Sequence, residues 1–365
     1  MLRTPATARL VAAPLATVAL SHAPRLCYST PAKSDLPKGP LHLLALSDLT
    51  RSDLYSILAT ATKFKRMSRS GVPLPQSLAG KHLAVIFTKR STRTRVAAET
   101  SMHLLGGHAI FLSPSDIQLG VNESTQDTAL VLSRLVHGIF ARVDNHGDLL
   151  QLRTHASVPV VNALSDDHHP TQALADALTM YEAAWRVDNP AAAERGELPS
   201  GFDANLLQGR KLAWVGDGNN VCHSLMTVCG KLGMVMSIAT PPGYGPKPSI
   251  VADEMMVPMI THHPLEALRG ADYVSTDCWI SMGQEKESVE RRKAFDGFKV
   301  TRSLMRQGGV KDKAGFLHCL PRKKDEVDDD VFYSKDSLVW EQAENRKWTI
   351  MAVMHHAMGV GSWQE

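Results

Sequence analysis

The chain alternates short apolar runs with helical patterns over most of its length, and this alternation restricts its fold more than any other feature. Helical periodicity is found between the apolar runs, for example over residues 94–105, 125–135 and 172–185. Strands that alternate with helices predict parallel sheets covered by helices on both faces. The predicted strands lie at residues 82–87, 108–112, 136–142, 158–162, 212–215, 235–239, 271–276 and 315–320.

The expected fold class is therefore α/β, with two doubly wound parallel-sheet domains. A chain of 365 residues is long enough for two or three domains of ordinary size. We expect the first domain at residues 35–185 and the second at 186–340, with a surface insertion rich in Ala, Glu, Pro and Gly near the boundary at 189–203. A last helix, at about 344–359 within the segment 341–365, is expected to pack back on the first domain.

The first 34 residues have a composition of their own. They contain no Asp or Glu, many Ala, Ser and Thr, and four cations: Arg3, Arg9, Arg25 and Lys33. This pattern is typical of an organelle transit peptide and predicts import into the mitochondrial matrix. The alternatives are a secretory signal, whose apolar core at 11–20 would be interrupted by Pro14, and a disordered tail.

The overall charge argues against a nucleic-acid partner, and the lack of a long apolar run argues against a membrane span. The formal net charge is +3, and cleavage near residues 25–29 would remove three arginines, leaving the mature chain close to neutral. A neutral chain argues against a nucleic-acid partner, which requires a basic surface. No run of 18 apolar residues free of charge is found, so we expect no membrane span.

The cysteines do not form a metal or disulfide framework. Cys27 belongs to the predicted presequence, and the other four form no C-x-x-C pair and no zinc spacing. The remaining cysteines are Cys222, Cys229, Cys278 and Cys319. Free thiols in a reducing compartment are the default interpretation.

The segment 89–95, Lys-Arg-Ser-Thr-Arg-Thr-Arg, follows a predicted strand and opens a predicted helix. The start of a helix offers unpaired backbone N–H groups, hydroxyls add donors, and an Arg fork matches a phosphate. Ligands of open α/β sheets also bind beyond the carboxyl ends of the strands. The segment indicates an anion site, whereas a capped helix with solvated arginines is the alternative. It lacks a Walker sequence, so binding of a nucleoside triphosphate is not implied.

A second polar segment, Asp-Asp-His-His-Pro-Thr-Gln at 166–172, also lies between a strand and a helix. A His can polarise a carbonyl group, and a Gln can bind an amide or carbamoyl NH₂. A metal-binding pair and a helix cap without chemistry are the alternatives for this segment.

Together, these two segments resemble the carbamoyltransferases, in which Ser-Thr-Arg-Thr-Arg and His-Pro-x-Gln hold carbamoyl phosphate. Further motifs agree in the same order: Phe-Ala-Arg-Val at 140–143, His-Cys-Leu-Pro-Arg at 318–322 and Glu-Asn-Arg-Lys-Trp at 344–348. The resemblance covers residues 41–359 apart from the insertion. It implies that carbamoyl phosphate binds to Ser91, Thr92, Arg93, Thr94, Gln118, Arg142, His169, Gln172, Cys319, Leu320 and Arg346.

The second half of the chain indicates which amine accepts the carbamoyl group. Asp277 through Gly283 matches the Ser-Met-Gly loop of the ornithine members, and 214–220 matches their second-domain turn. The resemblance implies that L-ornithine binds to Asn220, Asp277, Ser281 and Met282. A zwitterion needs a carboxylate for its α-ammonium, which Asp277 supplies, whereas an aspartate site would want extra cations that this loop lacks. Trp279 and Met282 would elsewhere be ordinary core residues.

The implied reaction is transfer of the carbamoyl group from carbamoyl phosphate to the δ-amine of L-ornithine, with citrulline and phosphate as products. Catalytic roles are implied for Cys319, Arg142 and His169. Cys319 resembles the family's proton acceptor, and we expect nearby arginines to lower the pKa of its thiol. No metal ion and no organic cofactor is implied.

The resemblance also implies an assembly. Gln118 lies in a loop that, in this family, reaches the carbamoyl phosphate of a neighbouring subunit, so a homotrimer is expected. We also expect the 281–283 loop to close over ornithine.

Three further functions match parts of the sequence less well. The sequence Gly-Asp-Gly at 216–218 suggests the dinucleotide fingerprint of a dehydrogenase, but Val221 stands where its third glycine would fall. A carbamoyltransferase that uses putrescine, acetylornithine or aspartate is the second, and a non-catalytic regulatory relative is the third. Intact Arg93, Arg142, His169 and Cys319 argue against the regulatory relative.

Overall fold

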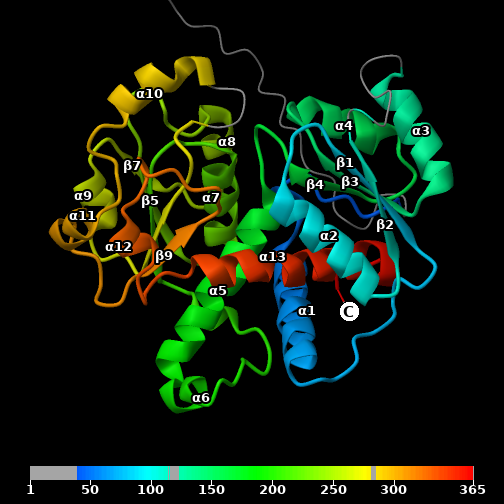
Figure 1. Ribbon diagram of the computed structural model, residues 1–365, viewed down its shortest axis with the longest axis horizontal. Helices are drawn as coiled ribbons and strands as arrows, with labels where there is room; N and C mark the ends of the chain where they lie inside the picture. The colour runs from blue at the N-terminus through cyan, green and yellow to red at the C-terminus, as the bar shows by residue number, and fades with distance from the viewer. Residues whose placement is uncertain (1–38, 114, 116–122, 281–284, 365) are drawn as a thin grey trace, which may run out of the picture. The chain divides into compact units, whose positions relative to one another are not determined.

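The first sheet contains four parallel strands in the order β2-β1-β3-β4 in the computed structural model (Figure 1). The structure describes residues 39–113, 115, 123–280 and 285–364. The four strands are β1 (His82–Phe87), β2 (His108–Leu112), β3 (Gly138–Arg142) and β4 (Val160–Leu164). The helices that connect or cover them are α1 (Arg51–Arg69), α2 (Thr92–Leu104), α3 (Thr125–Leu135), α4 (His146–His155) and α5 (Pro170–Asp188).

The second sheet contains five parallel strands in the order β7-β6-β5-β8-β9. They are β5 (Lys211–Val215), β6 (Val235–Ala239), β7 (Met259–Thr261), β8 (Tyr273–Thr276) and β9 (Gly315–His318). Its helices are α7 (Asn220–Leu232), α8 (Pro248–Ala252), α9 (Pro264–Leu268), α10 (Ser288–Ala294), α11 (Arg302–Gln307) and α12 (Asp329–Phe332). The prediction of an α/β protein with two parallel sheets is confirmed.

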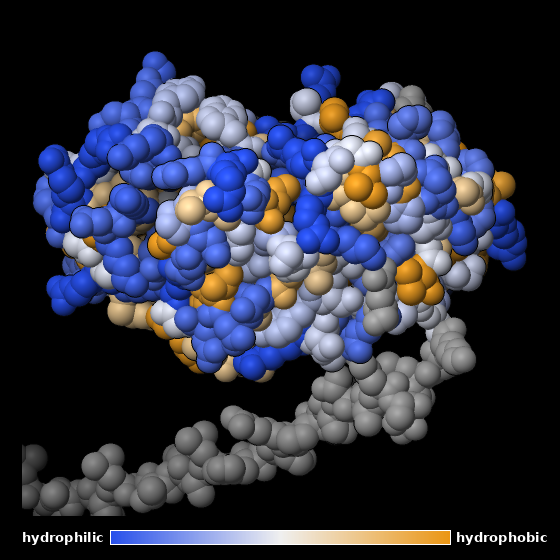
Figure 2. All heavy atoms as spheres, turned by 90° about the horizontal axis from the view of Figure 1, so that it is seen from below, coloured by the Kyte–Doolittle hydropathy of each residue, from blue (hydrophilic) through white to orange (hydrophobic). Residues whose placement is uncertain are grey.

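The core follows from the two-residue period of the strands. In β1, Leu83, Val85 and Phe87 belong to one buried cluster, whereas Ala84 and Ile86 belong to another on the opposite face. In β5, Leu212 and Trp214 join the first of these clusters, so one hydrophobic core extends from the first sheet to the second. Hydrophobic residues form only small separate groups on the face shown in Figure 2.

The last helix, α13 (Val339–Met354), packs against α5, α2 and α1 and also contacts β9. Figure 1 shows it running from the second sheet across to the helices of the first. The prediction that the C-terminal helix returns to the first domain is confirmed. A π-helical turn, His355–Val360, follows it.

Several predicted bounds differ from the structure. The predicted strand at 315–320 ends at His318, because Leu320 has a φ of 58°, which no strand accommodates. The predicted insertion contains a short helix, α6 (Pro190–Glu194). The edge strand β7 was missed because it has three residues and two of them are exposed. No helix of the described ranges combines the length and apolarity needed to cross a bilayer.

Candidate active site

Both halves of the candidate site lie where the strand order of a sheet reverses. In the first sheet the chain leaves β1 toward β2 and later returns to β3 on the other side. In the second sheet β5 is followed by β6 on one side and β8 on the other. Such points leave a crevice at the carboxyl ends of the strands, where open α/β sheets bind ligands.

The first half of the site is the turn between β1 and α2. Ser91 caps α2, and its Oγ accepts a hydrogen bond from the backbone N–H of Thr94 at 3.4 Å. Thr94 is buried, and its hydroxyl accepts a hydrogen bond from Arg346 Nη2 at 3.0 Å. The predicted anion site therefore has the expected helix start, with a cation from α13 beside it.

Two of the arginines that line the cavity are buried. Arg142 ends β3 and is 7% exposed, and Arg346 of α13 is 2% exposed. Within the described part of the chain neither forms an ion pair, and the Nε atom of each has no hydrogen-bond partner. Burial lowers the pKa of each guanidinium to about 10, so both stay charged at neutral pH. Buried cations without a carboxylate partner favour an anionic ligand.

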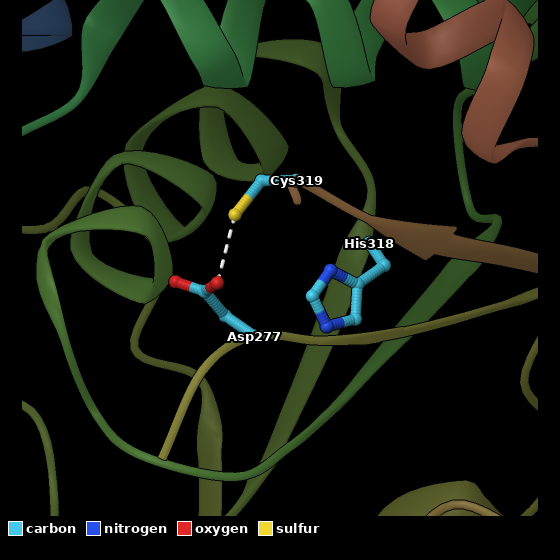
Figure 3. A group of neighbouring side chains, drawn as sticks. All are labelled: Asp277, His318 and Cys319. Atoms are coloured by element: carbon cyan, nitrogen blue, oxygen red, sulfur yellow. Dashed lines mark hydrogen bonds between the residues drawn. The ribbon is translucent and has the colours of Figure 1, made fainter. Parts of the chain in front are cut away.

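Asp277 follows β8 and is the centre of the second half. Its Oδ1 accepts a hydrogen bond from the Cys319 thiol at 2.8 Å, drawn in Figure 3, and its Oδ2 accepts one from Asn219 Nδ2 at 2.8 Å. Asn219 also caps α7, because its Oδ1 accepts hydrogen bonds from two backbone N–H groups of the first turn. The carboxylate is thus oriented by two separate elements.

The expectation of a lowered pKa at Cys319 was wrong. Desolvation raises the pKa of this thiol well above its ordinary value, and the charge of Asp277 raises it further. The arginines lie in the same cavity, but Asp277 is in direct contact with the sulfur. Cys319 is therefore a thiol that donates to a carboxylate.

The next residue, Leu320, presents its backbone carbonyl to the first half of the site. Arg93 Nη2 donates a hydrogen bond to this oxygen at 2.5 Å. The φ of Leu320 is 58°, in a region that is sparsely populated for residues other than glycine. Residues in such regions are often found at functional sites.

His169 and Gln172 belong to the start of α5 but have different positions. His169 is the N-cap residue, lines the cavity, and has a pKa well below its usual value because of burial and the charges of Arg346, Arg142 and Arg93. It is therefore neutral. Gln172 does not line the cavity; its Oε1 accepts a hydrogen bond from Arg346 Nη1 at 2.6 Å.

Asn220, the first residue of α7, lines the same cavity as the start of α2. Its Nδ2 donates to the backbone oxygen of Ser165 at 2.5 Å, between β4 and α5. The side chain therefore links the two halves of the site.

The residues of both halves line a single cavity of about 470 Å³. Its walls include the following predicted site residues: Ser91, Thr92, Arg93, Thr94, Arg142, His169, Asn220, Asp277, Cys319, Leu320 and Arg346. Of the other predicted residues, Gln172 lies behind Arg346, and Gln118, Ser281 and Met282 lie outside the described residues, as does the predicted transit peptide.

Asp277, His318 and Cys319 form the one group of three potential metal ligands among the described residues (Figure 3). Both ring nitrogens of His318 have other partners. Nδ1 accepts from the backbone N–H of Leu320 at 3.0 Å, which leaves the ring proton on Nε2, 3.2 Å from Glu326 Oε2. His318 thus shapes the turn that follows β9, and a metal ion would have to displace these bonds.

Sequence reasoning missed two contributors. Asn220 was predicted as a site residue but Asn219 was not, although an Asn directly before a helix is a recognisable capping signal. Lys323 also lines the cavity, and its Nζ donates to the backbone oxygen of Ile280 at 3.0 Å. No sequence signal separates this lysine from a solvated one.

Profiles of two protein domains match the chain. Residues 41–182 match the carbamoyl-P binding domain of aspartate/ornithine carbamoyltransferase, and residues 208–357 match the Asp/Orn binding domain. The chain belongs to the aspartate/ornithine carbamoyltransferase family. The prediction of a carbamoyltransferase is therefore confirmed.

Relatives from several organisms agree with this family. A mitochondrial ornithine carbamoyltransferase of Emericella nidulans is 42% identical, covering 93% of this chain and 95% of its own length. A mitochondrial ornithine transcarbamylase of Gallus gallus is 46% identical, over 91% of this chain and 90% of its own. The chain also resembles the crystal structure of a mitochondrial ornithine carbamoyltransferase from Coccidioides immitis, with a TM-score of 0.77 and 38% sequence identity. The match covers 88% of this chain and 98% of the Coccidioides chain.

Proposed function

We propose that this protein transfers the carbamoyl group of carbamoyl phosphate to the δ-amine of L-ornithine, giving L-citrulline and phosphate. One observation carries the proposal: a single cavity is lined both by the cationic turn between β1 and α2, with Arg142 and Arg346, and by the Asp277–Cys319 pair. The names of the relatives support the same acceptor. In the reaction the δ-nitrogen forms a bond to the carbamoyl carbon, and the C–O bond to phosphate breaks with its electron pair leaving on the phosphate.

The first task is to bind the phosphate as it leaves. The start of α2, through Ser91, Thr92, Arg93 and Thr94, supplies hydroxyl and backbone donors together with the partial positive charge of a helix N-terminus. Arg142 and Arg346 add two full charges from a buried position, where Coulomb attraction is stronger than in water.

The second task is to stabilise the carbonyl oxygen as it gains charge. Arg142, His169 and Thr94 are the candidates, because all three line the cavity. A neutral His169 can donate one hydrogen bond without adding a charge. Leu320 would hold the carbamoyl NH₂, because its backbone oxygen uses one lone pair for Arg93 and keeps a second to accept. Gln172 does not line the cavity, so a contact with the carbamoyl NH₂ would require its side chain to move; as it stands, its oxygen holds Arg346.

The third task is to bind and deprotonate the amine. Asp277 would hold the α-ammonium, Asn220 the α-carboxylate, and Ser281 and Met282 the rest of ornithine. The δ-ammonium resembles that of Lys and must lose a proton before it attacks. An ammonium beside Asp277 would offset the carboxylate charge that raises the pKa of Cys319, so that a larger fraction of the sulfur would be thiolate, the form that can accept a proton from the δ-ammonium.

A direct assay tests the proposal. Citrulline formation from carbamoyl phosphate is compared with the products formed from aspartate, putrescine and acetylornithine at equal concentrations. We expect ornithine to exceed each of the others by at least a hundredfold in kcat/KM. Equal use of putrescine would refute the proposed roles of Asn220 and Asp277, because putrescine has neither α-group.

The quaternary structure belongs to the proposal as well: a homotrimer in which Gln118 of one subunit completes the site of the next. Light scattering would give the mass of the assembly. Hybrids reassembled from Gln118→Ala and Cys319→Ala subunits should recover activity, since some sites then combine two unaltered residues. A fully active monomer would refute the shared site.

We further propose that residues 1–34 direct the chain to the mitochondrial matrix, as the names of several relatives suggest for those proteins. A reporter fused to residues 1–40 should enter the matrix, and replacing Arg3, Arg9 and Arg25 by Ala should keep it outside. The proposed domain bounds of 35–185 and 186–340, with 341–365 returning to the first domain, would be tested by limited proteolysis near residues 186–203.

A further inference from the structure

A buried carboxylate behind the cavity wall links its two halves. Asp176 lies on α5 and is 1% exposed. Its Oδ1 accepts a hydrogen bond from Gln172 Nε2 at 2.7 Å and a second from Gln342 Nε2, also at 2.7 Å. Its Oδ2 has no hydrogen-bond partner among the described residues. Both glutamines are buried too.

The first hydrogen bond decides which way the Gln172 amide faces. Because its NH₂ donates to Asp176, its oxygen faces α13 and accepts from Arg346 Nη1 at 2.6 Å. A flipped amide would present NH₂ to a guanidinium, and two donors would then oppose each other in a buried space. Asp176 thus sets the acceptor that holds one nitrogen of Arg346, while Thr94 and Thr171 hold the other.

The second hydrogen bond acts in the same way on the other half of the site. Gln342 donates its NH₂ to Asp176, so its oxygen accepts from the backbone N–H of His318 at 2.9 Å. Cys319 and Leu320 follow directly after this residue. A single acceptor atom on α5 therefore orients two amides, one toward Arg346 and one toward the end of β9.

We propose that Asp176 is a positioning residue that sets Arg346 through Gln172 and the Cys319–Leu320 turn through Gln342. This inference rests on the proposed function, since it assigns the phosphate to Arg346 and the amine to the turn. Asp176 itself does not line the cavity. Burial raises the pKa of its carboxyl to about 7.

The same two helices offer a matched control. Glu182 is on α5, is 3% exposed, and also faces α13, where it pairs with Lys65 at 2.8 Å and accepts from Asn345 Nδ2 at 3.0 Å. None of these three side chains lines the cavity. Glu182→Gln therefore removes from the same interface a buried carboxylate that has no hydrogen bond to Gln172, Gln342 or Arg346.

The test uses inorganic phosphate as the probe, so that it needs no turnover. Calorimetry of the full-length protein should show about tenfold to a hundredfold weaker phosphate binding in Asp176→Ala than in the wild type. Glu182→Gln should bind phosphate within twofold of the wild type, and Asp176→Asn, which keeps an acceptor oxygen, should regain most of the affinity. The double variant Gln172→Ala/Asp176→Ala should bind no worse than Gln172→Ala alone.

Kinetics separate the two arms. We expect Gln172→Ala to weaken phosphate binding. Gln342→Ala should leave phosphate binding unchanged but lower kcat at least fivefold. These two variants also test the inference if Asp176→Ala does not fold. Three outcomes would overturn the inference. Asp176→Ala could bind phosphate as tightly as the wild type, or the double variant could lose as much phosphate affinity as the two single variants together. Alternatively, Asp176→Ala and Glu182→Gln could lose the same phosphate affinity. A wild type that binds phosphate but makes no citrulline would instead overturn the proposed function.

Discussion

The Cys319 thiol donates a hydrogen bond to Asp277 Oδ1 across 2.8 Å, joining the ends of the adjacent strands β9 and β8. The carboxylate that orients the sulfur also disfavours its ionisation, since a thiolate beside it would be a second negative charge. The two side chains therefore act as one unit, and changing either one alters the other.

Replacing Asp277 by Asn should make Cys319 more reactive. The substitution removes a negative charge beside the sulfur, so the pKa of the thiol falls and the thiolate fraction rises. We expect alkylation of Cys319 by iodoacetamide at pH 8 to become at least threefold faster, measured by peptide mass spectrometry. The buried Cys222 and Cys229, whose pKa values burial also raises, serve as internal references. An unchanged or slower rate would show that Asp277 does not control this thiol.

Replacing Arg142 by Gln should lower kcat/KM by about 10²–10³, the usual effect of removing one donor from a developing oxyanion. The substituted side chain keeps some hydrogen-bonding capacity but loses a buried charge that has no carboxylate partner among the described residues. Steady-state kinetics at saturating ornithine would measure the loss. The control is Arg153→Gln, a half-exposed arginine paired with Asp48, which should change kcat/KM less than twofold. Equal activity of Arg142→Gln and wild type would remove Arg142 from the mechanism.

Asn219 has two functions that substitutions can separate. Asn219→Ala should lower the free energy of unfolding by about 1 kcal/mol through loss of the α7 cap, and should also raise KM for ornithine as Asp277 loses a donor. Asn219→Ser keeps a capping oxygen but cannot reach Asp277 as the longer amide does. The serine variant should therefore recover stability while KM for ornithine stays raised. If KM returned together with stability, the cap alone would explain the effect.

The protein should lose stability as the pH falls below 6.5. Burial, with the charges of His146 and His223, lowers the pKa of His168 to about 4. At His168 the unfolded chain therefore binds up to one more proton than the folded chain between pH 6.5 and about 4, so this residue makes stability fall with falling pH across this window. His168 accounts for at most about 2 kcal/mol between pH 6.5 and 5.

Urea unfolding at pH 7.5 and at pH 5 would measure this loss. The His168→Gln variant should lose less free energy of unfolding than the wild type over the same interval. His103→Gln, an exposed histidine at the end of α2, is the matched control and should lose as much as the wild type. The interpretation of His168 fails if both variants lose equal stability.

Much of the architecture was predictable from local patterns. The strands at His82–Phe87, His108–Leu112 and Val235–Ala239 were predicted to the residue, because their apolar runs stand out from polar flanks. The first and third are largely buried, as expected in a parallel sheet, whereas His108–Leu112 is a partly exposed edge strand. The short edge strand Met259–Thr261 was not predicted, since exposed residues in a three-residue strand leave no such contrast.

The chemistry of the site was predictable only in part. The residue types at 89–95, 169, 277 and 319 indicate a phosphate, a carbonyl and an amine through their charges and hydrogen-bonding groups, which belong to each side chain wherever it lies. The predicted direction of the Cys319 pKa shift was wrong because the shift depends on the burial of the thiol and on which charged group is nearest to it. Asp277 is 42 positions away in the chain but touches the sulfur.

The sequence by itself determined the α/β class, the order of the two half-sites and the kinds of group that each half holds. Only the tertiary structure decided that Asn219 orients Asp277, that Gln172 lies behind Arg346, and that Asp176 joins both halves. The physical reason is that local propensity and composition act over a few residues. The orientation of a buried amide or carboxylate is set instead by partners that folding brings together from distant segments, as α5 and α13 are here.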